Sequence, residues 1–195
     1  MNLNSLILAS ASPRRTDLLF KWNKSHRVIP SHAEELTQET ASYFTPVELV
    51  QANAFLKAKV VAKTYEKVWV LGVDTVVVYQ QKIFGKPRDL AEAHSMLQKL
   101  NGQTHQVISG LSLLSQAAHE FYCYLAFEIS AVTFKKLALK EIRAYLKEVP
   151  VLDKAGAYAA QEKGDWLIES IQGSSSNVIG LPKRNTLELL QRVGL

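Results

Sequence analysis

The sequence predicts a mixed α/β fold, and three stretches carry the prediction. Residues 68–78 are almost entirely apolar and β-branched, as expected for strand segments buried on both faces. Residues 45–63 begin with a capping box and continue as an alanine-rich helix. Residues 104–134 contain alternating or apolar strand-like stretches with a polar break at 115–120, which is typical of a long antiparallel hairpin. No internal repeat or clear linker interrupts this order. A chain of 195 residues can form one domain or two closely fused lobes, and we expect a single folding unit covering residues 1–195.

The first elements follow from local signals. Leu6–Leu8 form a short apolar strand, and Ser12 and Pro13 are a good N-cap and first residue for a helix that starts near Pro13. Residues 26–29 are a strand candidate, and the polar, acidic residues 31–40 are expected to form a loop. In the next helix, Thr45 and Glu48 form the capping box.

The remaining elements are expected in the second half of the chain. Asp89 is the N-cap of a helix that ends near Asn101-Gly102, with Glu92 at the capping-box position. The other expected elements are an amphipathic helix at 139–147, a strand at 166–171, a flexible turn at 173–176 and a terminal helix opened by Pro182.

Composition narrows the class of protein. The chain has 195 residues, of which 47% are hydrophobic and 21% charged, and this excludes wholesale disorder. No apolar run is long enough for a membrane span and no signal core is seen, so we expect a cytoplasmic protein that does not bind a membrane. The net charge of +5 favours an anionic partner. The basic residues are scattered without a nucleic-acid-binding signature, which favours a small anion over nucleic acid.

Two arginines lie in the first turn of the first helix. Cations there oppose the positive end of the helix dipole unless an anion binds among them. Free backbone N–H groups, the hydroxyls of Ser10 and Ser12, and the guanidinium groups of Arg14 and Arg15 would together bind phosphate. The alternative, taken on this segment alone, is a pair of solvated surface arginines.

Asp74 interrupts the apolar run at 68–78. An unpaired charge there would be costly to bury, so the residue needs a metal, a hydrogen-bond network or a cleft. We expect a strand-end aspartate that faces a cleft, and the alternative is a turn or capping aspartate. Lys86, in the turn Gly85-Lys86-Pro87, could neutralise phosphate oxygens, and Lys57 could do so or be a surface charge.

The sequence gives less support to other kinds of metal, nucleotide-binding or nucleophilic site. The acidic pair Glu34-Glu35 could supply a hard oxygen ligand for Mg²⁺ or Mn²⁺, or be solvated surface. Neither a phosphate-binding loop of the Walker kind nor a dinucleotide fingerprint is present. The five histidines lack zinc spacing, Ser109-Gly110 lacks the context of a nucleophile elbow, and Cys123 is expected to be a buried structural thiol.

Seven collinear motifs together resemble the Maf family of nucleoside triphosphate pyrophosphatases, from end to end of the chain. They are Leu8-Ala9-Ser10-Ala11-Ser12-Pro13-Arg14-Arg15 with Leu18, Glu35, Lys57-Ala58, Gly72-Val73-Asp74-Thr75-Val76-Val77, Gly85-Lys86-Pro87-Arg88-Asp89, Leu152-Asp153-Lys154-Ala155-Gly156-Ala157-Tyr158, and Asn177-Val178-Ile179-Gly180-Leu181-Pro182. The resemblance implies a fold related to the inosine triphosphate pyrophosphatases, with a central mixed sheet, flanking helices and two lobes around a cleft.

The resemblance also implies the reaction, which is hydrolysis between the α and β phosphates with a divalent cation, Mg²⁺ or Mn²⁺. Asp74 matches the family's proposed proton acceptor, and Glu35 and Asp74 would hold the metal. Ser10, Arg14, Lys57 and Lys86 would grip the triphosphate, which suits a reaction that depends on positioning and charge.

Base choice is implied by three further positions. Arg15, Thr75 and Gln161 resemble the members that prefer dTTP and UTP and differ from those that act on 7-methyl-GTP. We therefore expect a dTTP/UTP pyrophosphatase that also accepts some modified pyrimidine triphosphates, and the resemblance suggests a homodimer. Two alternatives stay open, a broad house-cleaning pyrophosphatase for non-standard nucleotides and a nucleotide-binding inhibitor of septum formation. The chain departs from the family after Gln161, where Glu162-Lys163 stand in place of the glycine that relatives often have.

Overall fold

The computed structural model describes residues 5–117 and 120–195, which separate into two compact units. The first unit comprises Met1–Asp74, Ser109–Glu128 and Gly180–Leu195, apart from residues 1–4 and 118–119. The second comprises Thr75–Ile108 and Ile129–Ile179. A single domain over residues 1–195 stays a prediction.

Seven strands of the described residues share one mixed sheet, as the α/β prediction requires. Their order is β2-β1-β3-β5-β6-β7, with β4 paired to β3. The bounds are β1 (Leu6–Leu8), β2 (Arg27–Val28), β3 (Trp69–Tyr79), β4 (Lys82–Phe84), β5 (Thr104–Ala117), β6 (Glu120–Phe134) and β7 (Ile168–Gln172). Strand β1 is parallel to β2 and β3, whereas β4 and β7 are antiparallel to their neighbours. Strands β3, β5 and β6 contribute residues to both units.

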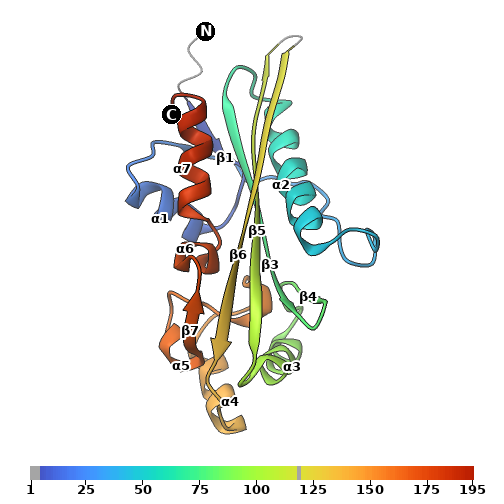
Figure 1. Cartoon of the computed structure of the whole chain (residues 1–195), viewed down its shortest axis with the longest axis vertical. Helices are drawn as coiled ribbons and strands as arrows, with labels where there is room; N and C mark the ends of the chain where they lie inside the picture. The colour runs from blue at the N-terminus through green and yellow to red at the C-terminus, as the bar shows by residue number, and fades with distance from the viewer. Residues whose placement is uncertain (1–4, 118–119) are drawn as a thin grey trace. The chain divides into compact units, whose positions relative to one another are not determined.

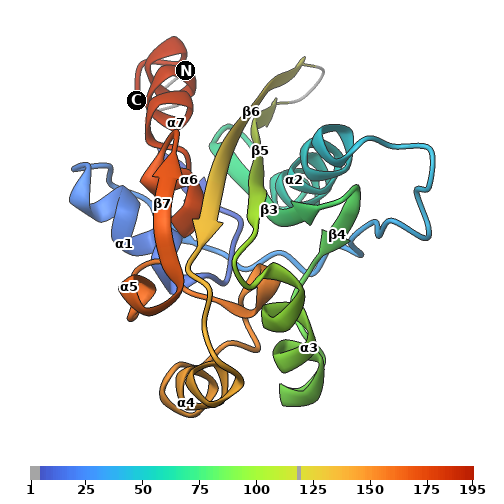
Figure 2. The ribbon, with the colours of Figure 1, turned by 60° about the horizontal axis from the view of Figure 1, so that its bottom comes forward.

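The first unit places helices on both sides of its strands. Its helices are α1 (Pro13–Lys21), α2 (Pro46–Ala62) and α7 (Lys183–Arg192). Helix α2 lies on one side, and α1 and α7 lie on the other (Figures 1 and 2). The predicted start of α2 is confirmed, because the Thr45 hydroxyl accepts from the Glu48 N–H and the Glu48 carboxylate accepts from the Thr45 N–H. This capping box fixes where the helix that carries Lys57 begins.

Two glycines let α2 rest directly on the backbone of the sheet. A Cβ atom at Gly72 of β3 would lie 2.0 Å from the Ala54 carbonyl oxygen, and one at Gly110 of β5 would lie 2.4 Å from the Val50 carbonyl carbon. Real Cβ atoms do not approach a backbone this closely, so any larger residue would push the helix away. The absence of side chains at these two points therefore sets the distance between α2 and strands β3 and β5.

The second unit is built around its own apolar core. Its helices are α3 (Leu90–Leu100), α4 (Leu139–Glu148), η1 (Ala155–Ala157), α5 (Gly164–Leu167) and α6 (Ser175–Ile179). Helix α3 packs against α4 and η1, as Figure 2 shows for α3 and α4. The core includes Leu97 of α3, Val132 of β6, Tyr145 of α4 and Tyr158 after η1. The predicted N-cap of α3 is confirmed, since the Asp89 carboxylate accepts from the Glu92 N–H. The Glu92 carboxylate instead accepts from the Arg88 N–H and Nε.

Four local predictions are wrong or partly wrong. The strand expected at 166–171 begins at Ile168, because Trp166 and Leu167 close the short helix α5. The turn expected at 173–176 leads into helix α6, whose start is fixed by a hydrogen bond from the Asn177 N–H to the Ser174 hydroxyl. Cys123 is half-buried rather than buried, with its Sγ atom 3.7 Å from the Ser112 hydroxyl oxygen. Of the polar break expected at 115–120, residues 115–117 still belong to β5 and Glu120 already begins β6, while residues 118–119 lie outside the described residues.

No helix in the described part of the chain is both long enough and apolar enough to cross a membrane.

A buried histidine in the second unit predicts a loss of stability in acid. His105 is stacked edge-on against Phe134 and Tyr158 and shares a 2.9 Å hydrogen bond with the Tyr158 hydroxyl. Burial lowers the pKa of His105 from 6.5 to about 4. Because the unfolded chain then binds the proton more tightly, His105 supports the fold fully above pH 6.5, and this support is lost as the pH falls from 6.5 to about 4.

We expect urea unfolding of the natural protein to show this loss as a fall of up to roughly 3 kcal/mol between pH 6.5 and 4. His105→Gln removes the titrating group, so its unfolding free energy should vary less over the same range. His26→Gln is the matched control, because this histidine lies on the loop before β2 and bonds the Lys24 carbonyl. Equal pH dependence in the natural protein and in His105→Gln would contradict the assignment.

Candidate active site

Asp74 lies inside strand β3 rather than at its end. The strand runs from Trp69 to Tyr79, because the β-branched residues after Asp74 continue the pairing as far as β4. The expectation of a strand-end aspartate is therefore wrong. Asp74 is 6% exposed, and its burial is compensated by a network of polar partners, one of the three arrangements that the sequence left open.

Lys57 joins two carboxylates of the first unit. Its Nζ atom lies 2.7 Å from Asp74 Oδ1 and 2.9 Å from Glu35 Oε1. Lys57 and Asp74 are nearly buried, whereas half of the Glu35 side chain is exposed. Of the adjacent glutamates Glu34 and Glu35, the structure pairs Glu35 with Lys57. The three predicted residues Glu35, Lys57 and Asp74 thus form one cluster.

Asn53 completes the cluster and was not expected from the sequence. It lies one turn before Lys57 on α2, so both side chains project from the same face of the helix. Its Nδ2 atom donates to Asp74 Oδ2 at 3.2 Å and to the Leu36 carbonyl at 3.0 Å, and its Oδ1 atom accepts from the Leu36 N–H at 2.8 Å. The sequence signal that could have identified Asn53 is a polar amide between two alanines, four residues before the lysine of the Lys-Ala motif.

The second part of the site lies at the start of α1. Ser10 is buried, and its hydroxyl accepts from the Ser12 N–H at 3.2 Å and from Arg15 Nη1 at 2.9 Å. The Arg15 guanidinium also donates to the carbonyls of Val73, at 3.1 Å, and Gly180, at 2.9 Å. Ser12 precedes α1 without capping it through its side chain. Arg15 therefore connects Ser10 to the residue immediately before Asp74.

The surroundings of Arg15 have opposing effects on its pKa. Burial, together with the neighbouring charge of Arg14, lowers the pKa from 12.5 to about 10, although the carboxylates of Asp74 and Glu35 act to raise it. Arg15 remains a cation at neutral pH. The first turn of α1 therefore carries two positive charges, those of Arg14 and Arg15, as the phosphate-binding interpretation requires.

Three further predicted residues belong to the second unit. Thr75 follows Asp74 on β3 and is half-buried, whereas Lys86 in the turn after β4 and Gln161 after η1 are exposed. Before η1, Lys154 is a buried cation whose Nζ atom bonds the Pro150 carbonyl and pairs with Asp153 Oδ1 at 2.8 Å.

Lys154 also reaches the residue after Gln161, since its Nζ atom lies 3.6 Å from Glu162 Oε1. At the position after Glu162, Lys163 has a left-handed backbone with φ of 53°, a conformation that favours glycine. Lys154 belongs to the motif at residues 152–158, and it is buried between the turn at residues 150–153 and Glu162.

The cluster offers oxygen ligands suited to a divalent cation. Glu35 and Asp74 already approach a single positive charge, the ammonium group of Lys57, so their carboxylates converge on one point. Carboxylate oxygens are the ligands that Mg²⁺ and Mn²⁺ prefer, and Mg²⁺ commonly uses one or two of them together with phosphate and water. The described residues contain no group of three or more side chains from His, Cys, Asp and Glu that could hold a metal by themselves. The two carboxylates therefore fit a site that substrate and water complete.

Known proteins resemble this chain over nearly its full length. Residues 5–193 match the family model described as Maf-like protein. A dTTP/UTP pyrophosphatase of Bacillus cytotoxicus is 42% identical over 180 residues, which cover 92% of this chain and 91% of that protein. Proteins of the same name from a Geobacillus species and from Akkermansia muciniphila are each 40% identical, covering 98% and 97% of this chain and 100% and 96% of their own lengths. On this full-length match, the chain belongs to the Maf family.

Proposed function

We propose that this protein is a cytoplasmic nucleoside triphosphate pyrophosphatase that hydrolyses dTTP and UTP to the monophosphate and pyrophosphate. The observation that carries the proposal is the cluster of Glu35, Lys57 and Asp74. It lies in a chain about 40% identical, over nearly its full length, to relatives named for this activity. Modified pyrimidine triphosphates are further substrates in this proposal.

Asp74 is the proton acceptor of the reaction. Its carboxylate is held at both oxygens, by Lys57 at Oδ1 and by Asn53 at Oδ2, so it orients the attacking water or removes a proton from it in a defined direction. Such a reaction needs no covalent nucleophile, because positioning and charge stabilisation provide most of the acceleration in phosphoryl transfer. Glu35 is the second carboxylate of this machinery and is positioned through Lys57.

Glu35 and Asp74 would hold the divalent cation. When bound, this cation supplies stabilisation of the negative charge that develops on the phosphate oxygens. Lys57 is placed to balance the two carboxylates, and in this proposal its ammonium group also contacts the triphosphate, together with Ser10, Arg14 and Lys86.

Base selection is assigned to Arg15, Thr75 and Gln161. The Gln161 amide can both donate and accept hydrogen bonds at the edge of a pyrimidine. The bonds of Arg15 to Ser10 and Gly180 support a second contribution, in which Arg15 holds the substrate-binding segments in place. The anchoring of the Gln161 loop through Lys154 supports a fixed presentation of the Gln161 side chain.

A substrate panel tests the proposal. Pyrophosphate release is measured from dTTP, UTP, CTP, 7-methyl-GTP and ITP with Mg²⁺ or Mn²⁺, and we expect selective cleavage of dTTP and UTP. Preference for ITP would instead favour the house-cleaning pyrophosphatase. Binding of nucleotides without cleavage of any of them would favour the septum-formation inhibitor, in which the nucleotide is a ligand.

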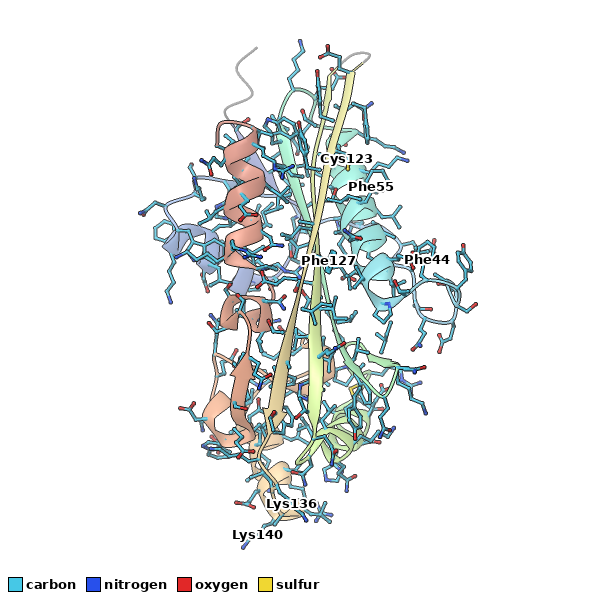
Figure 3. All side chains as sticks on the ribbon, viewed as in Figure 1. Phe44, Phe55, Cys123, Phe127, Lys136 and Lys140 are labelled. Atoms are coloured by element: carbon cyan, nitrogen blue, oxygen red, sulfur yellow. The ribbon has the colours of Figure 1, made fainter. Side chains whose placement is uncertain are left out.

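We further propose that the protein forms a homodimer through an apolar face of β6. Alternate residues of a strand share one face, and Phe121, Leu125 and Phe127 are 51%, 51% and 45% exposed. The Phe121 ring lies edge-on to Phe55 of α2, with ring centroids 6.2 Å apart. Figure 3 labels Phe55 on α2 and Cys123 and Phe127 on β6, all in the first unit. Exposed apolar side chains gathered in this way are typical of protein interfaces.

Light scattering after size-exclusion chromatography tests the dimer. The natural protein is expected at twice the mass of one chain, and Leu125→Lys at the mass of one chain, because a charge would be buried in the interface. Leu139→Lys is the matched control, since this leucine of α4 is also 51% exposed and belongs to the second unit. A natural protein that elutes as a monomer would contradict the proposal.

A further inference from the structure

Asn53 makes three hydrogen bonds in the buried part of the first unit. It is 3% exposed, and its side-chain amide pairs with both the N–H and the C=O of Leu36, as the backbone of a neighbouring strand would. The second hydrogen of Nδ2 is directed to Asp74 Oδ2. Rotating the amide by half a turn would place its oxygen against the Asp74 carboxylate, so the chemistry of the partners fixes its orientation.

Residue 36 follows Glu35 in a segment without regular secondary structure. The Glu35 side chain is half exposed, and its pair with Lys57 holds only the carboxylate at the end of that side chain. The paired hydrogen bonds at Leu36 fix the backbone one residue away. Asn53 therefore fixes the backbone position from which the Glu35 side chain extends.

The close approach of α2 to β3 makes this arrangement possible. Gly72 lies two residues before Asp74, so both residues present the same face of β3 to the helix. Because Gly72 lacks a side chain, the helix backbone comes near enough for the short amide of Asn53 to reach Asp74, while the longer Lys57 approaches the other carboxylate oxygen.

From these contacts we infer that Asn53 is a positioning residue, which holds the Glu35 segment and the Asp74 carboxylate in a single arrangement for hydrolysis. The inference rests on the proposed function. Asn53 is the one neutral member of the cluster, and an amide supplies one acceptor and two donors in a plane without adding charge. Neither leucine nor aspartate can replace it, since leucine has no polar atom and ionised aspartate has no donor.

Asn53→Leu tests the role, and Asn101→Leu is a closely matched control. Asn101 pairs its amide with both the N–H and the C=O of Leu137 at 2.8 Å, so it makes the same paired bonds to a loop backbone in the second unit. For Asn53→Leu we expect kcat for dTTP to fall about 10- to 100-fold with little change in KM, because misplaced catalytic groups slow the chemical step. For Asn101→Leu we expect kcat and KM close to those of the natural protein.

Hydrogen exchange in the protein treated with EDTA gives a readout independent of activity. The peptide that contains Leu36 should exchange about fivefold faster or more in Asn53→Leu, and the peptide that contains Leu137 should do so in Asn101→Leu. Should Asn53→Leu fail to fold, Asn53→Asp replaces it. This variant keeps an acceptor for the Leu36 N–H and loses both donors, so Leu36 should remain protected while kcat still falls.

The outcomes separate the two proposals. An active natural protein whose Asn53→Leu or Asn53→Asp variant keeps its kcat overturns the role of Asn53 and leaves the proposed function intact. Unchanged exchange at Leu36 in Asn53→Leu also overturns that role. A natural protein that cleaves no triphosphate overturns the proposed function, and the positioning role falls with it.

Discussion

Asp74→Asn is expected to lower kcat for dTTP by about 10²- to 10⁴-fold, the range typical of a lost proton acceptor. Asparagine keeps the size of the side chain but cannot accept a proton at neutral pH. Lys57 keeps its pairing with Glu35, at 2.9 Å, so the lysine is not left buried without a counter-charge. Pyrophosphate release at saturating dTTP measures the effect, and circular dichroism confirms that the variant is folded.

Asp153→Asn is the matched control for this change. It also removes an aspartate from a buried lysine, since Asp153 Oδ1 lies 2.8 Å from Lys154 Nζ, but Asp153 is largely exposed and belongs to the second unit. We expect kcat to change by no more than about threefold, because Lys154 keeps its bond to the Pro150 carbonyl and lies 3.6 Å from Glu162 Oε1, so it is not left without a partner. Equal losses of kcat in the two variants would mean that Asp74 supports activity only by stabilising a buried lysine and not as a proton acceptor.

Gly72→Ala is expected to destabilise the fold by about 3 kcal/mol or more, which is the upper range for overpacking. The added Cβ atom would lie 2.0 Å from the Ala54 carbonyl oxygen and 2.9 Å from the Ala58 nitrogen. Both are backbone atoms of α2, so no side-chain rotation can relieve the contact. The helix must move, and Asn53 and Lys57 move with it, so kcat should fall as well. Urea unfolding followed by circular dichroism measures the change in stability.

Gly85→Ala provides the comparison. A Cβ atom there would have nothing within 4 Å, and its unfolding free energy should stay within about 1 kcal/mol of the natural protein. If Gly72→Ala were as stable as Gly85→Ala, the close contact between α2 and β3 would be refuted.

Sequence patterns predicted the elements whose signals are local. Thr45 with Glu48, and Asp89 before α3, marked helix starts that the structure confirms, because a cap depends on residues a few positions apart. The apolar run at 68–78 likewise became β3. The helix that includes Trp166 and Leu167 is four residues long, too short for a periodic pattern to reveal.

The candidate site was predicted in part. The cluster of Glu35, Lys57 and Asp74 came from motifs recognised together, and the structure brings these three residues into contact. Asn53 was missed because its partners, Leu36 and Asp74, are 17 and 21 positions away, and no local pattern encodes such contacts. The position of Asp74 inside β3 was also unpredictable locally, since it depends on pairing with β4 and on the counter-charge from α2.

The contact between α2 and strands β3 and β5 has a consequence for how this protein can change over evolutionary time. A clash between two side chains can be repaired by a smaller residue on either side. Where a side chain would clash with the backbone of a helix, no substitution in the helix can make the clashing atoms smaller. Substitutions at Gly72 or Gly110 should therefore have few second-site suppressors within α2. Mutational drift can act freely on exposed loop residues away from the site, while these two positions in the sheet stay closed to it.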